Sequence, residues 1–383
     1  MHKLIKIKRD YNYNIPKKVI KYLSPDFCYV PLPNDILFDS DTNKTYVNQF
    51  LYNDLKYPYS ASISGKIIGT ENRSIKGITV NCLSIKNDFK ERKAPKEKYH
   101  EIIFFEDLIS MLDNLRLFSL KEKLNVKNVK YLVFNCICDD VFQFNESQYL
   151  LEYSDEILET LDNLLRILKI GTCTACIKNI DSTAIESFIS VIGSYTNINA
   201  RLFEDKYLLA RKFFICEQLA ITDKSTIMLT PYDVYQLYNV IKYNKRVDNK
   251  IISITDTVKR KNYLMQTKIY TPVSELLKNV NRNLKSDELL ICGSLLTGNE
   301  SDSEKEIVTD ESSSYYIIKG NLKAEEECSN CGKCYQICPV KVNPKLSMDN
   351  HKKNKNCIDC GLCSYICPSY INLRRFLKGE KDE

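Results

Sequence analysis

The spacing of apolar residues changes along the chain and separates a strand-rich beginning from a mixed middle. Along residues 57–69 and 77–85, apolar and small residues alternate and glycines stand at the turns, which predicts two short strands. From about residue 100, segments with helical periodicity alternate with short apolar runs. Such an alternation of helices and buried strands is typical of a parallel α/β sheet.

The middle of the chain contains the clearest of these patterns. Segment Ser154–Leu168 is strongly amphipathic, because its apolar residues share one face and Asp155, Glu159 and Asp162 lie on the other. Residues 298–314 are acidic and rich in serine, so we expect a solvated loop there. Further helices are predicted at residues 100–115, 182–192, 231–243 and 273–280, and strands at residues 129–135, 171–177, 250–257 and 288–292.

These elements predict a multidomain α/β protein with four parts. A small β-domain comes first and ends in a charged linker that contains Pro95. An α/β domain follows, then a small α+β unit, and then the segment with the densest cysteines. The expected boundaries are residues 1–90, 99–230, 231–297 and 320–383.

Composition and charge narrow the classes of function. The chain has 383 residues, enough for several domains, and its net charge of +6 is mild and scattered. No basic stretch is interleaved with aromatic residues, so we expect no binding to nucleic acid. The first residues lack the apolar core of a secretion signal, and no run approaches the ~18 apolar residues of a transmembrane helix. With 16 cysteines and no sign of an oxidising compartment, we expect a cytoplasmic protein.

Eight of the 16 cysteines form two copies of one pattern near the end of the chain. Each copy has the spacing Cys-x2-Cys-x2-Cys-x3-Cys-Pro, which is that of bacterial two-cluster ferredoxins. In that pattern, three cysteines of one run bind one [4Fe–4S] cluster and the fourth reaches the other cluster. The expected ligands of the first cluster are Cys328, Cys331, Cys334 and Cys367, and those of the second are Cys357, Cys360, Cys363 and Cys338.

Structural zinc and disulfide bonds are the alternative explanations of these two runs. Structural zinc favours paired Cys-x2-Cys sets without a third cysteine three residues on. Disulfides need an oxidising compartment. Two complete runs, each with its trailing proline, favour two [4Fe–4S] clusters and therefore a protein that moves electrons.

Four other cysteines lie at or near two predicted strands, namely Cys136, Cys138, Cys173 and Cys176. A Cys-x2-Cys pair can mark redox or metal chemistry. Residues three apart in a strand point to opposite faces, however, so Cys173 and Cys176 are not expected to share a site. We interpret all four as packing residues, as free cysteines often are. The three histidines are isolated, which gives no support to a histidine-based metal or catalytic site.

With its domains in this order, the chain resembles the C subunit of the Rnf electron-transport complex, a family that includes an electron-transfer protein associated with proline reductase. Residues 357–369, with residues 371–373 after them, are similar to that family's ending. Residues 29–32 and 60–65 resemble its barrel-sandwich domain, and residues 292–298 resemble a glycine turn of its β-grasp (SLBB-like) domain. The resemblance implies a Rossmann-like α/β domain between these two and a two-cluster ferredoxin-like domain at the end.

The chain departs from that family where its members bind flavin and NADH. Their glycine-rich loop, about Gly-Gly-Ala-Gly-Phe-Pro-Thr, matches residues 114–124, yet no glycine occurs from residue 78 to residue 170. A phosphate-binding loop needs backbone N–H groups free of Cβ crowding, which the leucines here do not offer. The family's next motif, Asn-Gly-Ala-Glu-Cys-Glu-Pro, keeps Asn135 and has Asp140 for its second acidic residue. We therefore expect the fold of the α/β domain without an FMN or NAD(H) site.

Two classes of function remain. In the first, the chain is an electron-relay subunit between a redox donor and a partner reductase or membrane complex. In the second, it is a flavin-dependent NADH-oxidising subunit of an Rnf-type complex. A scaffold that the clusters only stabilise is a third and weaker alternative. The missing glycines favour the relay, and we expect an electron carrier or oxidoreductase subunit rather than a stand-alone enzyme.

The relay class implies a redox protein as partner: a ferredoxin, a flavoprotein, an amino-acid reductase, or the membrane subunits of an Rnf-type complex. With membrane subunits, the protein would lie at the inner face of the cell membrane without a span of its own. The segment between the two cysteine runs is a candidate docking surface for an acidic donor. Its lysines are Lys341, Lys345, Lys352, Lys353 and Lys355, although a loop this basic is also common as a solvated surface.

Overall fold

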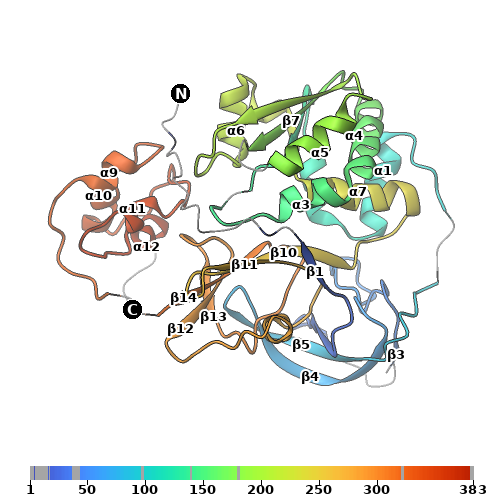
Figure 1. Ribbon diagram of the computed structural model, residues 1–383, viewed down its shortest axis with the longest axis horizontal. Coiled ribbons are helices and arrows are strands. Elements are labelled where there is room, and N and C mark those ends of the chain that lie inside the picture. The colour runs from blue at the N-terminus through green and yellow to red at the C-terminus, as the bar shows by residue number, and fades with distance from the viewer. Residues whose placement is uncertain are drawn as a thin grey trace.

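The computed structural model describes residues 4, 16, 18–36, 44–95, 99–138, 140–178, 182–320 and 323–379. These residues form three β-sheets, with helices around one of them, and a small helical body at the carboxyl end (Figure 1). The multidomain α/β architecture expected from the sequence is confirmed.

The N-terminal sheet has four antiparallel strands. β4 and β5 form a long hairpin that turns at Lys76 and Gly77, both with positive φ. Its core contains Cys28 and Cys82, which are fully buried among aliphatic and aromatic residues. In order across the sheet, the strands are β2 (Phe27–Pro31), β5 (Ile78–Asn87), β4 (Gly65–Ile75) and β3 (Lys44–Thr45).

The second sheet has four strands, all parallel, as the alternation of helices and strands predicts. Its strand order is β8 (Ile198–Phe203), β7 (Cys173–Lys178), β6 (Tyr131–Asn135) and β9 (Thr226–Leu229). The helices of this domain are α1 (Phe105–Asn114), α2 (Phe118–Leu124), α3 (Asn145–Glu152), α4 (Ser154–Leu168), α5 (Ser182–Ile192), α6 (Lys212–Leu219) and α7 (Pro231–Tyr243).

The third sheet has six strands and combines parallel with antiparallel pairs. Its order is β1 (Val19–Tyr22), β11 (Lys261–Lys268), β10 (Asn249–Asp256), β14 (Ser314–Lys319), β12 (Glu288–Cys292) and β13 (Asn299–Ser301). Helix α8 (Val273–Asn279) contributes to its core. Strand β1 comes from the first 22 residues, so the N-terminal part of the chain contributes to this sheet as well as to its own.

The prediction of a solvated loop at residues 298–314 is wrong. Part of this segment is strand β13, and both Ile307 and Val308 are fully buried. Ile307 N–H donates to the carbonyl of Ser74, and Tyr270 N–H donates to the carbonyl of Val308. The segment therefore joins the first and third sheets, because its apolar pair is buried between them despite the acidic residues around it.

The C-terminal body contains four short helices and lies beside the parallel α/β domain (Figure 1). They are α9 (Lys333–Ile337), α10 (Pro344–Asp349), α11 (Leu362–Tyr365) and α12 (Leu373–Lys378). Helices this short are not stable on their own. The apolar core of the body is small and includes six of the clustered cysteines.

Among the residues that the structure describes, no helix has both the length and the apolar character needed to cross a bilayer.

Candidate iron–sulfur centre

Both cysteine runs fold in the same local way. In each, a loop with two cysteines reaches a glycine in the left-handed region, and a short helix follows. The glycines are Gly332, with φ of 70°, and Gly361, with φ of 76°. A side chain at either position would be strained, whereas glycine allows the sharp turn that directs successive cysteines to one side.

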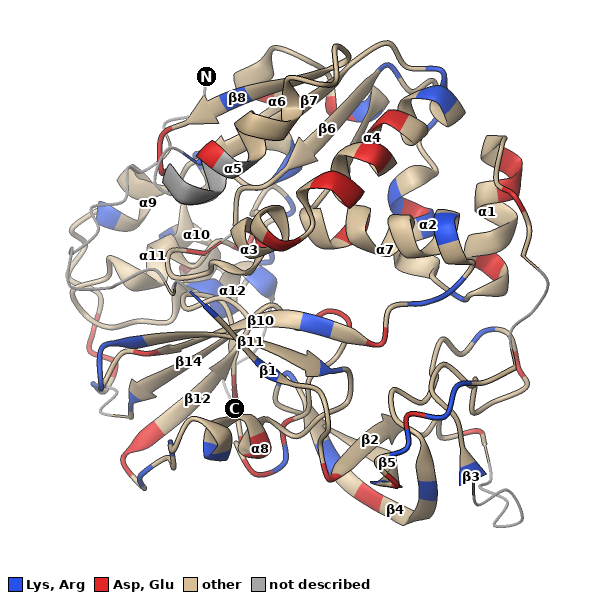
Figure 2. Ribbon diagram, turned by 45° about the vertical axis from the view of Figure 1, so that its right-hand side comes forward, with Lys and Arg blue, Asp and Glu red and all other residues tan. Residues whose placement is uncertain are grey.

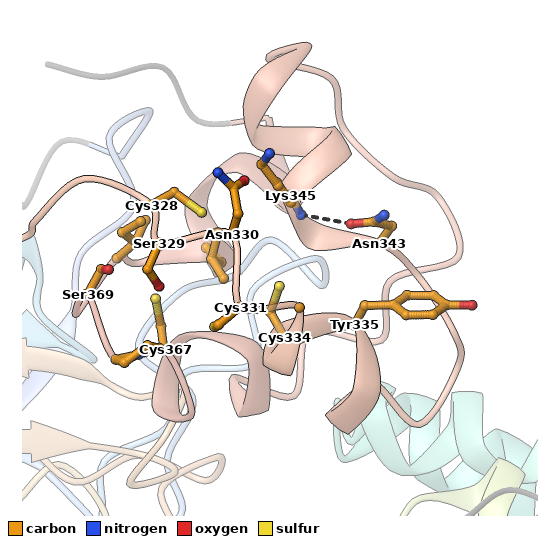
Figure 3. A pocket seen from close by; sticks show the side chains of 14 residues that line it. Cys328, Ser329, Asn330, Cys331, Cys334, Tyr335, Asn343, Lys345, Cys367 and Ser369 are labelled. Atoms are coloured by element: carbon orange, nitrogen blue, oxygen red, sulfur yellow. Dashed lines mark hydrogen bonds between the residues drawn. The ribbon is translucent and has the colours of Figure 1, made fainter.

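The first cavity has a volume of about 200 Å³, and four of the predicted ligands line it. Three come from the first run, and the fourth comes from the end of the second run. Figure 3 shows their side chains around this space, with Tyr335, Asn343 and Lys345 along one side of it. The four cysteines are Cys328, Cys331, Cys334 and Cys367.

The second cavity combines one cysteine of the first run with three of the second. Its cysteines are Cys338, from the end of the first run, and Cys357, Cys360 and Cys363. It is also lined by the apolar Val340, Val342, Leu362 and Leu377. Its volume is only about 20 Å³. The structure thus groups all eight cysteines in the two crossed sets that the spacing predicts.

Thiolates are the usual protein ligands of [4Fe–4S] clusters, so the donor set of each cavity fits one cluster. The first cavity offers room as well. The second holds little more than one water molecule, so the side chains around it must move apart when a cluster binds. No group of three or more Cys, His, Asp or Glu residues in the described part of the chain converges as a single metal ion requires. Ligation by the eight cysteines remains a prediction.

The two sets of cysteines differ in exposure. Cys331 is exposed, whereas Cys360 and Cys363 are only 8% and 7% exposed. A hydrogen bond from the Lys333 N–H lowers the pKa of Cys331, and burial raises the pKa of Cys363 to about 12. Because only the thiolate binds metal, cluster binding at the second site must displace protons from buried thiols.

Two hydrogen bonds to sulfur involve cysteines of the second set. Val342 N–H donates to Cys338 Sγ at 3.3 Å, and Asp359 N–H donates to Cys357 Sγ at 3.4 Å. Such bonds stabilise negative charge on the sulfurs and so influence the potential of a bound cluster. The second site is therefore the more enclosed of the two, and these two of its sulfurs accept backbone hydrogen bonds.

Cysteines 136, 138, 173 and 176 are all buried. Cys173 packs in the core on one face of the parallel sheet and Cys176 in the core on the other, as the strand geometry predicts. Burial raises the pKa of Cys176 to about 12 and that of Cys136 well above its ordinary value. Thiols held neutral in this way are unreactive, which supports their interpretation as packing residues.

Residues 114–124 form the end of α1, a turn and helix α2. In the turn, Arg116 has φ of 53° and is 6% exposed. Its guanidinium donates to the carbonyls of Tyr52 and Tyr57, at 2.8 and 2.9 Å, and lies 4.0 Å from the ring centre of Phe50. Arg116 thus joins this turn to the N-terminal domain.

Two residues near the second site were not indicated by the sequence. Tyr207 OH donates to the carbonyl of Cys360 at 2.9 Å, and the Arg211 guanidinium donates to the carbonyl of Ile358. Both come from the parallel α/β domain, about 150 residues before the loop that they contact. No local pattern marks such residues, because their role depends on a contact between domains.

Comparison with known families adds one decisive match. Residues 321–368 match the family model described as 4Fe-4S dicluster domain. The C-terminal segment is similar to 4Fe–4S dicluster domains. Iron–sulfur electron transfer is therefore the chemistry of this part of the protein, which agrees with the grouping of the cysteines. No curated protein matches the chain.

Two solved structures similar to the chain are crystal structures of NAD+-reducing [NiFe]-hydrogenase, in the H2-reduced and the air-oxidized state. Sequence identity is 7% and 6%, and the TM-score is 0.46 in both cases. The similarity covers 72% and 71% of this chain, which spans only 59% and 60% of those chains. At these values the likeness carries no argument about function.

Proposed function

We propose that this protein is an electron-relay subunit similar to the C subunit of Rnf complexes, with two [4Fe–4S] clusters that pass electrons between a redox donor and a partner reductase or membrane complex. The observation that carries the proposal is the crossed grouping of eight cysteines in two cavities. Helix α9 supports it further, since Cys334 lines the first cavity and Cys338, one turn later, lines the second. One helical turn rises about 5.4 Å, so the two clusters would be close enough for rapid electron exchange.

The proposal includes the identities of the other domains. An antiparallel sheet in residues 1–90 is compatible with a barrel-sandwich-like domain, and the parallel sheet in residues 99–230 with a Rossmann-like domain. Strands β10, β11 and β12 with helix α8 are compatible with a β-grasp (SLBB-like) domain in residues 231–297. Residues 320–383 would form the two-cluster ferredoxin-like domain.

The metal content tests the proposal directly. We expect about eight iron atoms and about eight acid-labile sulfides per chain in protein purified without oxygen, because both sets of four thiols are complete. Iron and sulfide assays, with zinc measured in the same samples, provide the numbers. Half of these values, or stoichiometric zinc in place of iron, would contradict the proposal.

A second prediction separates the relay from the NADH-oxidising alternative. We expect no tightly bound FMN and no NADH oxidation, because Arg116 lies where the family has a glycine-rich phosphate loop. Flavin fluorescence of the supernatant after denaturation is the measurement, with dye reduction by NADH as a second one. Stoichiometric FMN, or rapid NADH-driven reduction of the dye, would favour the dehydrogenase instead.

The partner of the relay is the third element of the proposal. Residues 323–379 contain ten lysines and arginines against five acidic residues, and Figure 2 shows basic positions on α9 and α12. Of the lysines of the predicted docking surface, Lys345 lines the first cavity. Its ammonium group also lies 3.6 Å from the carboxylate of Asp349. A surface of this charge would attract an acidic electron carrier.

Charge reversal tests that surface. Changing the exposed Lys352, Lys353 and Lys355 to glutamate should leave both clusters in place and slow reduction by an acidic carrier several-fold at low salt, with little effect at high salt, because salt screens the attraction. Stopped-flow reduction rates measure the effect. The matched control reverses three exposed lysines of the N-terminal sheet, Lys44, Lys66 and Lys86. Equal rates in the two triple variants at low salt would exclude this docking surface.

A further inference from the structure

The carboxyl edge of the parallel sheet is covered by a segment of the same domain, residues 205–211. This edge is where α/β folds usually bind their ligands. Asn135, the last residue of β6, donates from its side-chain amide to the carbonyl of Ala210 at 2.8 Å. Lys178, the last residue of β7, forms an ion pair of 3.0 Å with Asp205, and both side chains are buried. The ends of the neighbouring strands β6 and β7 therefore hold residues 205–211 in place.

The segment in turn holds the loop that carries the second set of cysteines. The Tyr207 hydroxyl donates to the carbonyl of Cys360, and the Arg211 guanidinium donates to the carbonyls of Ile358 and Asp359, the latter at 3.3 Å. The two carbonyls that Arg211 binds lie between the predicted ligands Cys357 and Cys360, and the carbonyl that Tyr207 binds belongs to Cys360 itself. Apolar contacts surround the hydrogen bonds and involve Leu208, Phe214, Leu296 and Leu362.

The equivalent loop of the first run has a different environment. Ser329, Asn330 and Cys331 are exposed there, whereas Cys360 in the second run is buried against Tyr207. The two runs have the same spacing, so the spacing cannot cause this difference. The contacts of the second loop with residues 205–211 and with Leu296 account for the difference.

We propose that Arg211 and Tyr207 are positioning residues that hold the second cluster's loop on the sheet edge, and that the charge of Arg211 raises the reduction potential of that cluster. The inference rests on the proposed second cluster. Reduction adds one electron to a cluster whose thiolates already make it negative, and a nearby positive charge stabilises the added electron. Arg211 is well placed for this, because it binds the backbone between two of the ligands.

The first test is a redox titration followed by EPR on anaerobic Arg211→Gln and Arg211→Lys proteins. A Cys334→Ala background leaves the second cluster alone for the assignment. We expect Arg211→Gln to shift the reduction equilibrium of the second cluster about threefold to tenfold toward the oxidised form, about 30–60 mV for one electron, without changing the first cluster. Arg211→Lys keeps the charge and should restore most of the potential. Equal potentials in all three proteins would overturn the role of the charge.

Hydrogen–deuterium exchange tests the holding role without relying on a cluster. In Arg211→Gln, and to a smaller degree in Tyr207→Phe, residues 357–361 should exchange faster than in the parent, while residues 328–332 should not change. Unchanged exchange at residues 357–361 in both variants overturns the holding role. If the iron assay finds no second cluster, the relay proposal fails. The exchange result still shows whether Arg211 and Tyr207 hold residues 357–361.

Discussion

Replacing Cys334 with alanine should remove the first cluster and leave the second, so that iron and sulfide fall to about half. The reason is that Cys334 lines only the first cavity, where it would supply one of four thiolates. Cys363→Ala should have the opposite effect and leave the first cluster, because Cys363 lines only the second cavity. Iron assays and low-temperature EPR of the reduced proteins measure both outcomes.

The fourth cysteine of each run provides a sharper form of this test. Because the sets are crossed, Cys367→Ala should reproduce the spectrum of Cys334→Ala, although Cys367 belongs to the second run. Cys338→Ala should likewise reproduce Cys363→Ala. If each fourth cysteine instead behaves like the other cysteines of its own run, the crossed assignment is wrong. Cys216→Ala, at a buried cysteine far from both runs in sequence, should retain all of the iron.

Alanine at the two equivalent glycines should have very unequal effects. Both have positive φ, so alanine costs roughly 1–2 kcal/mol of strain at either position. At Gly332 nothing lies within 4 Å of the added Cβ, and we expect both clusters to be retained. At Gly361 the Cβ would lie 2.5 Å from the carbonyl oxygen of Leu296, which is backbone and cannot easily move away.

Gly361→Ala should therefore cost about 1–3 kcal/mol more than Gly332→Ala and loosen the second loop from the body of the protein. Thermal unfolding followed by circular dichroism gives the difference in stability, and limited proteolysis between residues 357 and 361 reports the loosening. Similar losses in the two variants would show that the second run is not packed against the loop at Leu296.

The elements that the sequence predicted best are those with strong local signals. Helix α7 begins at Pro231 as predicted, because Thr230 accepts a hydrogen bond from the Asp233 N–H and proline is favourable in the first turn. Helices α4 and α5 and strand β12 also have the predicted bounds. In the two helices, the apolar periodicity is long enough to define both ends.

The features that the sequence did not reveal depend on contacts between distant segments. Strand β1 pairs with β11, more than 200 residues later, and nothing near residue 20 indicates that partner. The segment around Ile307 was misjudged because its acidic neighbours outweighed a buried apolar pair. The cysteine groups were predicted because ligand spacing is a local property, whereas the contact of Arg211 with the second loop is not.

The contact of Tyr207 and Arg211 with only one of the two runs gives a symmetric motif asymmetric surroundings. With the repeated ligand pattern alone, two bound clusters would have similar reduction potentials. With one cysteine set near solvent and the other against the α/β domain, two bound clusters would have different environments, one exposed and one buried. The direction of flow through the protein would then be set by the scaffold that surrounds the clusters, and a change of scaffold could reverse it without altering a single ligand.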